Sequence, residues 1–198
     1  MSDFSAEYWD KISQNRLLHQ GGKSHRGRTI RYYEYLKQIT ETCCISSVLD
    51  YGCGRAHQWR VPIMALKETP MLKDYLGVSN VTCYDPAVAE FSELPPEQPF
   101  DLVICTDVLS LIPSLDLPLV FQQIHKRCGQ AVFFVVQSDI ERSNKKYPDG
   151  SPKQVTIKSR QWWLETLQSS ADWTSKKIYW KWAEDGRITK EKLTPLDL

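Results

Sequence analysis

One short stretch of the chain combines residue types that could bind a small ligand. It reads Val48-Leu49-Asp50-Tyr51-Gly52-Cys53-Gly54-Arg55-Ala56, so an apolar run passes into Asp, then Gly-x-Gly, then a small residue. Because glycine carries no Cβ, Gly52 and Gly54 let the backbone turn tightly and lie against a ligand. The following segment offers free N–H groups at the start of a helix. The pattern predicts binding at the carboxyl end of a buried strand.

Acidic residues around this loop indicate which ligand it would take. Asp50 precedes the glycines, where a carboxylate attracts an ammonium group and repels a pyrophosphate. Asp85 ends the next strand-like run, Cys83-Tyr84-Asp85-Pro86, and can accept hydrogen bonds from two ribose hydroxyls. The two carboxylates favour a ligand with a ribose and an ammonium group over a dinucleotide. A purely structural turn at the loop and a helix cap at Asp85 are the alternatives.

In these stretches the sequence resembles the class I S-adenosylmethionine-dependent methyltransferases. The matching residues are Leu49-Asp50-Tyr51-Gly52-Cys53-Gly54, Tyr84-Asp85-Pro86-Ala87-Val88 and Phe100-Asp101-Leu102-Val103-Ile104-Cys105-Thr106-Asp107-Val108-Leu109. A narrower resemblance is to a little-characterised group of small bacterial and phage methyltransferases. In that group Asp-Pro-Ala-Val follows the second strand, and Pro-Asp-Gly with a later Trp-Trp follows the fifth. Here these stand as Asp85-Pro86-Ala87-Val88, Pro148-Asp149-Gly150 and Trp162-Trp163.

The resemblance implies that the cofactor is S-adenosylmethionine and that S-adenosylhomocysteine is its product. Asp50 and the two glycines would hold the methionine end, and Asp85 would hold the ribose hydroxyls. Tyr84 and Pro86 would flank the adenosine. Asp107 and Val108 would line the floor near the sulfonium, unless Asp107 caps a short helix. The residues expected at the cofactor are, in full, Asp50, Tyr51, Gly52, Cys53, Gly54, Tyr84, Asp85, Pro86, Thr106, Asp107 and Val108.

The chain departs from the family pattern in its spacing. The third loop glycine is replaced by Ala56, which is small enough to be tolerated. Asp85 lies 35 positions after Asp50, against about 20 in the nucleotide-binding pattern, so residues 57–76 must form an extended first helix or an inserted turn. Only 14 residues separate Asp85 from Phe100. We therefore expect a contracted crossover between the second and fourth strands of the family pattern, with residues 91–94 as its remnant and Phe91 over the adenine.

Basic residues near the N-terminus are candidates for contact with the methyl acceptor. They are Lys23, His25, Arg26, Arg28 and Arg31. The cluster, with Lys23 and Arg26 as the named contacts, either binds an anionic substrate or forms a solvated helix face. His25 and His57 are candidate general bases if the acceptor must lose a proton. A structural or simply exposed histidine is the alternative for each.

Further along the chain, two polar residues are expected near the acceptor. Gln137 ends a strand-like run and would face the cleft. Tyr147 begins Tyr147-Pro148-Asp149-Gly150, which forms either a loop above the cleft or a plain turn. Trp162, Trp163, Trp173, Trp180 and Trp182 form either a stacking platform for bases or part of the core.

Several function classes are disfavoured by what the sequence lacks. It has no Gly-x-Ser-x-Gly nucleophile motif, no metal-ligand spacing of Cys or His, and no apolar run long enough for a membrane span. The net charge of +1 argues against binding to nucleic acid by bulk charge. We expect methyl transfer to a small molecule or a sugar or cell-surface precursor, in the cytoplasm. An RNA or other nucleic-acid methyltransferase, a cofactor-binding protein without activity and, least favoured, a nucleotide-dependent oxidoreductase are the alternatives.

The elements that must position these residues alternate between strand and helix. Strands are expected at 46–51, 80–84, 100–106 and 131–137, with helices at 5–18, 26–42 and 115–128. This alternation predicts an α/β fold: a Rossmann-like, mostly parallel sheet with helices on both faces. A strand at 155–158, a helix at 160–169 and an antiparallel last strand at 176–183 would complete it. We expect one domain over 1–198, with an N-terminal helical cap at 1–44 and a core at 45–198.

Overall fold

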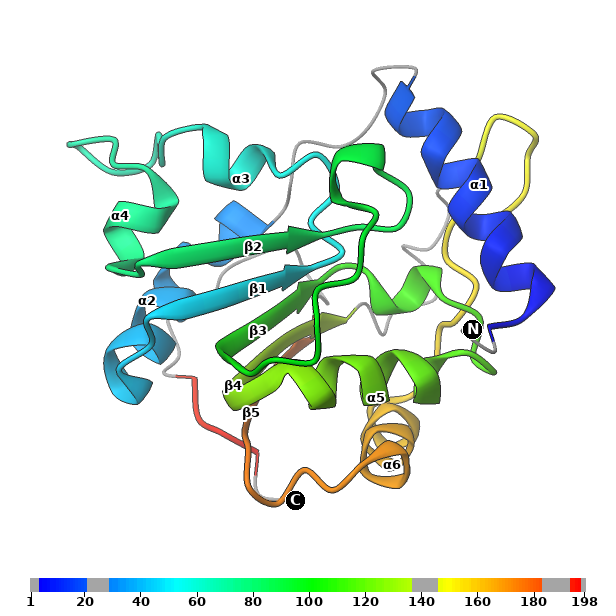
Figure 1. The fold of residues 1–198 in the computed structure, drawn as a ribbon. Coiled ribbons are helices and arrows are strands. Elements are labelled where there is room, and N and C mark those ends of the chain that lie inside the picture. Colours follow the sequence, from blue (N-terminus) through cyan, green and yellow to red (C-terminus); the bar gives the residue numbers. More distant parts are fainter. Residues whose placement is uncertain (1–3, 21–28, 137–145, 183–192, 197–198) are drawn as a thin grey trace.

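Five parallel strands form the centre of the protein in a computed structural model that describes residues 4–20, 29–136, 146–182 and 193–196 (Figure 1). Their order in the sheet is β2-β1-β3-β4-β5. The strands are β1 (Ser47–Tyr51), β2 (Asn80–Tyr84), β3 (Phe100–Thr106), β4 (Cys128–Val136) and β5 (Lys177–Trp182). β3 and β4 are apolar almost throughout because helices cover both faces of the sheet.

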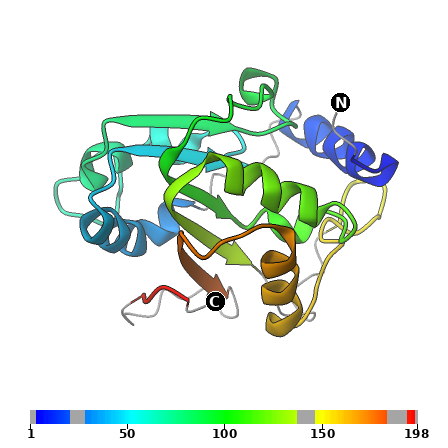
Figure 2. The same ribbon diagram turned by 60° about the horizontal axis from the view of Figure 1, so that its bottom comes forward.

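Side chains of β3 alternate between two apolar layers, as the period of a strand requires. Leu102 and Ile104 pack beneath α2 (Tyr33–Cys43) and α4 (Leu72–Leu76). Val103 and Cys105 point to the opposite layer, which is covered by α5 (Leu117–Arg127) and α6 (Arg160–Ser170). Figure 2 shows α5 and α6 lying against each other on this face. The sheet is therefore held rigidly from both sides, which fixes the loops at its carboxyl edge.

Helix α1 (Ala6–Gln20) lies across the carboxyl ends of the strands instead of on a sheet face (Figure 1). Its first turn is capped by Ser5, whose Oγ accepts a hydrogen bond from the Tyr8 amide at 3.1 Å. The amide and hydroxyl of Ser5 in turn donate to the buried Asp116 carboxylate, at 2.7 and 2.6 Å. On the other side Arg16 donates to the carbonyl of Pro86 at 3.2 Å. These bonds tie the start of α1 to the residue before α5, and its second half to the loop that follows β2.

The expectation of an antiparallel last strand is wrong, because β5 pairs with β4 in the parallel sense. The predicted strand at 155–158 does not form; the amides of Val155 and Thr156 donate to the carbonyl of Ser110 instead. Without that strand, α6 is the crossover from β4 to β5, and a helical crossover returns the chain in the same direction. Antiparallel pairing at this edge is limited, in the described residues, to a single bridge between Ile178 and Leu196.

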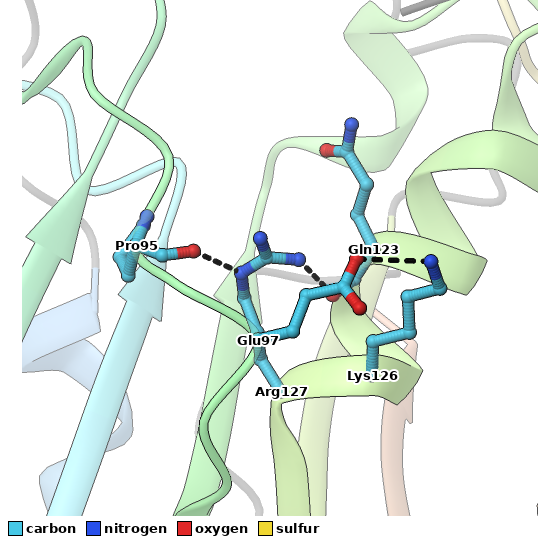
Figure 3. A network of polar contacts seen from close by, with 5 residues as sticks. All are labelled: Pro95, Glu97, Gln123, Lys126 and Arg127. Atoms are coloured by element: carbon cyan, nitrogen blue, oxygen red, sulfur yellow. Dashed lines mark hydrogen bonds and ion pairs between the residues drawn. The ribbon is translucent and has the colours of Figure 1, made fainter.

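The contracted crossover between β2 and β3 is confirmed. Residues 85–99 contain a single 3₁₀ turn, η2 (Ala89–Phe91), where 91–94 were expected. Figure 3 shows how this segment is fixed without a helix of its own. The buried Arg127 donates through Nε to the carbonyl of Pro95 at 2.7 Å and through Nη1 to that of Gln123 at 3.0 Å. Beside it Lys126 pairs with Glu97 at 2.9 Å.

Residues 57–76 accommodate the long spacing with two short helices and turns. They are α3 (His57–Arg60) and α4, and an isolated bridge between Pro62 and Met71 closes the segment between them. The expected helix at 26–42 begins, within the described residues, with the 3₁₀ turn η1 (Thr29–Tyr32) and continues as α2. The expected cap at 1–44 thus contains two helices with different positions. Helix α2 packs on a face of the sheet, and α1 lies over its carboxyl edge (Figure 1).

Candidate functional site

A cavity of about 210 Å³ lies between α1 and the carboxyl edge of the sheet. Nine of the eleven residues expected at the cofactor line it: Tyr51, Gly52, Cys53, Gly54, Asp85, Pro86, Thr106, Asp107 and Val108. They come from the ends of β1, β2 and β3, three neighbouring parallel strands. The sequence prediction therefore identified residues from three separate segments that meet around one space.

The glycine loop after β1 is shaped by contacts that other residues could not make. Gly52 has φ of +81°, and a Cβ on it would lie 2.3 Å from Cγ2 of Val108. Gly54 also has positive φ, at +58°. The amides of Gly52 and Cys53 both donate to the carbonyl of Tyr84, at 2.7 and 3.1 Å. The loop is thus folded back onto the end of β2, next to Asp85.

Asp85 joins the loops after β1 and β2. Its Oδ2 accepts a hydrogen bond from the Gly54 amide at 2.8 Å, and its Oδ1 accepts one from the Ala87 amide at 2.9 Å. Burial raises the pKa of this carboxyl group, although the two amides and the nearby His19 oppose the rise. Each carboxylate oxygen has a second lone pair. Asp85 can therefore fix the turn that follows it and still accept ligand hydroxyls from the cavity.

Asp50 and Tyr84 do not line the cavity. Asp50 is 1% exposed, and its Oδ2 accepts hydrogen bonds from Gln58 Nε2 at 2.6 Å and Trp59 Nε1 at 2.7 Å. Burial raises its pKa to about 6, against the effect of these two bonds. The Tyr84 ring packs against that of Tyr51, with centroids 4.9 Å apart. Both residues support the loops from beneath, while their neighbours along the chain face the ligand space.

The end of β3 contributes two polar residues. Asp107 has φ of +59°, an unusual value for a residue with a side chain, and its amide donates to the carbonyl of Val135 at 2.9 Å. The helical turn that follows, η3 (Leu109–Leu111), has no side-chain cap. Capping therefore does not account for Asp107. Thr106 shares a 2.7 Å hydroxyl–hydroxyl bond with Thr29 of η1.

One face of α1 forms the opposite wall; the sequence led us to expect a helical cap at 1–44, but it did not single out the residues of this helix that line the cavity. The lining residues of this helix are Tyr8, Lys11, Ile12, Asn15, Leu18 and His19. Their spacing of three or four positions would have placed them on one face. Because the face mixes apolar, amide and charged groups, it gave no clear apolar stripe. Lys153 and Gln154 complete this side from the segment before α6.

His19 is the α1 residue that meets the glycine loop. Its Cε1 would lie 3.7 Å from a Cβ on Gly54. Its buried Nδ1 makes no hydrogen bond with any residue that the structure describes. Burial lowers its pKa from the usual 6.5, and the neighbouring Asp85 carboxylate opposes this. A neutral imidazole with an unused nitrogen can accept or donate a hydrogen bond to a ligand here.

The remaining candidates fall into three groups. His57 is half-buried in α3 and does not line the cavity. Lys23, His25, Arg26 and Gln137 lie outside the described residues. Tyr147 is buried beside α1, with the ammonium groups of Lys11 and Lys153 over its ring.

The five tryptophans between positions 162 and 182 belong to the core, as one of the two interpretations predicted. Trp163, Trp173 and Trp180 are buried within the layer under α5 and α6, and Trp162 and Trp182 pack against it. They do not line the cavity.

The described ranges contain no group of three or more His, Cys, Asp or Glu residues placed to hold a metal ion. All six cysteines are free thiols. A search of the described helices found none with the length and apolar character of a membrane span.

A family model described as "Methyltransferase domain" matches residues 7–185. The chain belongs to the methyltransferase domain family. The resemblance to class I S-adenosylmethionine-dependent methyltransferases is thereby confirmed, while membership of the small bacterial and phage group stays a prediction. Comparisons with curated proteins and with solved structures gave no match. In this methyltransferase the matched span runs from the first turn of α1 through all five strands of the sheet.

Proposed function

We propose that this methyltransferase binds S-adenosylmethionine in the cavity under α1 and transfers its methyl group to a small-molecule acceptor. The proposal rests mainly on the hydrogen bond from the Gly54 amide to the Asp85 carboxylate, at 2.8 Å. Through this bond a glycine loop and an acidic group lie next to each other in the wall of the cavity. Families of this kind typically use this cofactor. When bound, it supplies an electrophilic methyl group on a sulfonium.

The residues present fit such a cofactor. Gly52 and Gly54 line the cavity without side chains of their own, and the absent Cβ of Gly52 leaves the space that the Val108 side chain occupies beside it. Asp85 would accept hydrogen bonds from the ribose hydroxyls, and Pro86 and Ala87 beside it offer apolar surface to the adenosine. Asp107 and Val108 would border the methionine end. Asp50 acts indirectly, by holding the loop through Gln58 and Trp59.

Methyl transfer requires the protein mainly to align the acceptor and to exclude water. Helix α1 supports both tasks, since it covers the carboxyl edge and contributes six lining residues. The covered cavity also supports a small acceptor over a polymer. We infer that methylation of a nucleic acid is a less favoured function, and so is cofactor binding without methyl transfer.

A transfer assay tests the proposal directly. Purified protein is incubated with methyl-tritiated S-adenosylmethionine and a fractionated cell extract, and label is followed into small molecules, RNA and protein. We expect label in the small-molecule fraction, and its loss with Asp85→Ala but not with Asp74→Ala, which changes an exposed carboxylate. Label that enters RNA and disappears after ribonuclease would favour the nucleic-acid alternative. Cofactor binding without any transfer would contradict an enzymatic role.

A further inference from the structure

Lys11 is a buried cation in the wall of the cavity. Only 8% of this residue is exposed. Its Nζ approaches two neutral oxygens, Gln14 Oε1 at 3.3 Å and the carbonyl of Pro152 at 3.4 Å. No carboxylate of the described residues lies within ion-pair distance of it. Burying an ammonium group is costly unless an opposite charge compensates, so this position is suited to an anion.

A second cation converges on the same place. Lys11 Nζ lies 5.2 Å from the centroid of the Tyr147 ring, and Lys153 Nζ lies 5.6 Å from it. Both lysines line the cavity. An aromatic ring attracts each ammonium group, but it does not neutralise two like charges. The pair therefore produces a positive potential at one end of the cavity.

The fold holds these groups in place through contacts between α1 and the segment 146–153, which lie side by side (Figures 1 and 2). The Tyr147 amide donates to the carbonyl of Ser151 at 2.8 Å, which closes a tight turn. Gln14 of α1 donates to Asp149 of that turn at 3.2 Å. The positions of both lysines thus depend on one interface within the chain.

Two acidic groups near Tyr147, Asp149 and Asp10, act on this charge only from outside the cavity. Hydrogen bonds from Ser151 lower the pKa of Asp149, and Lys11 helps to lower it. Asp149 and Asp10 are exposed, and neither lines the cavity. Asp149 is already bonded by the amide and hydroxyl of Ser151, and Asp10 by Gln14. The acidic residues that do line the cavity, Asp85 and Asp107, follow strands β2 and β3. The cavity therefore has acidic groups on its sheet wall and basic groups on its α1 wall.

We propose that Lys11 and Lys153, supported by Tyr147, form a binding site for an oxyanion, a carboxylate or phosphate group. The inference rests on the proposed function, because it concerns the same cavity. The oxyanion belongs either to the methyl acceptor, which would then be an acidic metabolite, or to the carboxylate of the cofactor. The chemistry of recognition is the same in both cases, and ligand truncation separates them.

The test uses calorimetry at low ionic strength, where charge effects are least screened. S-adenosylhomocysteine carries the carboxylate, and 5′-methylthioadenosine lacks the amino acid altogether. Inorganic phosphate, titrated into protein saturated with S-adenosylhomocysteine, probes an acceptor site. Each ligand is measured with the wild type, Lys11→Met and Lys153→Met. Lys37→Met is the matched control, since Lys37 also lies over a tyrosine ring, that of Tyr75, but pairs with Glu41 and does not line the cavity.

Two results would support the site, and they identify the source of the oxyanion. If the lysine variants weaken S-adenosylhomocysteine binding tenfold or more and leave 5′-methylthioadenosine unchanged, the cofactor carboxylate binds there. If they leave both nucleosides unchanged and abolish the phosphate response, the acceptor carries the oxyanion. Unchanged binding of all three ligands would overturn the inference. Failure of the wild type to bind either nucleoside would contradict the proposed function instead, and the phosphate titration of the free protein would still test the lysines.

A stability measurement separates an anion site from a structural lysine. Lys11→Met keeps the apolar stem and removes a buried charge that lacks a carboxylate partner in the described structure. We expect its melting temperature without ligand to equal or exceed that of the wild type, while the oxyanion response is lost. A lowered melting temperature with unchanged ligand binding would show that Lys11 only stabilises the fold.

Discussion

The imidazole of His19 lies so close to the glycine loop that its Cε1 would be 3.7 Å from a Cβ on Gly54. This proximity brings the last turn of α1 next to the residue whose amide donates to Asp85. The two walls of the cavity therefore meet at Gly54. A ligand held by Asp85 would lie within reach of His19 as well.

His19→Ala is expected to weaken binding of S-adenosylhomocysteine about fivefold. The buried Nδ1 has no hydrogen-bond partner among the described residues, and one hydrogen bond gained with the ligand contributes about 1 kcal/mol. Calorimetry gives the dissociation constant. His57→Ala, which alters a histidine outside the cavity, is the control and should bind as the wild type does. Equal affinity of His19→Ala and the control would exclude contact of His19 with the cofactor.

Gly52→Ala is expected to abolish cofactor binding and to destabilise the protein by more than about 2 kcal/mol. It adds backbone strain at positive φ to a clash with Val108 at 2.3 Å. Gly77→Ala separates the two effects, since Gly77 has φ of +71° and open space around it. Urea unfolding should show a loss of only about 1–2 kcal/mol for Gly77→Ala. Recovery of more than half of the lost stability in the double variant Gly52→Ala/Val108→Ala would identify the clash as the larger effect.

The stability of the protein is expected to fall as pH rises from about 4 to 6 through the contribution of Asp50. Burial raises the pKa of this carboxyl group from 3.8 to about 6, so the folded state binds a proton more tightly than the unfolded state. The contribution, on the order of 3 kcal/mol, is complete below pH 4 and lost above pH 6. Urea unfolding across this range should show a flatter profile for Asp50→Asn than for the wild type. Parallel profiles would mean that Asp50 titrates normally.

Arg127→Met is expected to cost about 2–4 kcal/mol of stability, because the buried guanidinium bonds the carbonyls of Pro95 and Gln123 (Figure 3). Lys126→Met is the matched control. Its ion pair with Glu97 is exposed and should contribute less than about 1 kcal/mol. Similar losses in the two variants would show that the contracted crossover does not depend on Arg127.

The positions of the glycine loop and of Asp85 at the strand ends could be predicted from the sequence, because local geometry determines them. Positive φ at Gly52 and the strand ends at Tyr51 and Tyr84 follow from residue type and apolar patterning. The contracted crossover followed from chain length alone. Each of these features depends on residues close together in the chain.

Two kinds of feature could not be obtained in this way. The direction of β5 depends on which segment pairs with β4, and the sequence at 155–158 suggested a strand that does not form. The α1 wall depends on where a mostly polar helix docks. Its docking relies on Ser5 and Asp116, which are 111 positions apart. Asp50 shows a further limit, since its position in the motif does not reveal that Gln58 and Trp59 turn it away from the cavity.

Calorimetric titration with S-adenosylhomocysteine shows whether Asp85 and the glycine loop bind S-adenosylmethionine. We expect binding in about the micromolar range, weakened roughly 10- to 100-fold by Asp85→Ala through loss of charge-assisted hydrogen bonds. Asp74→Ala, an exposed carboxylate on α4, should bind as the wild type does. Absence of binding to the folded wild-type protein, or equal affinity in Asp85→Ala, would contradict the account.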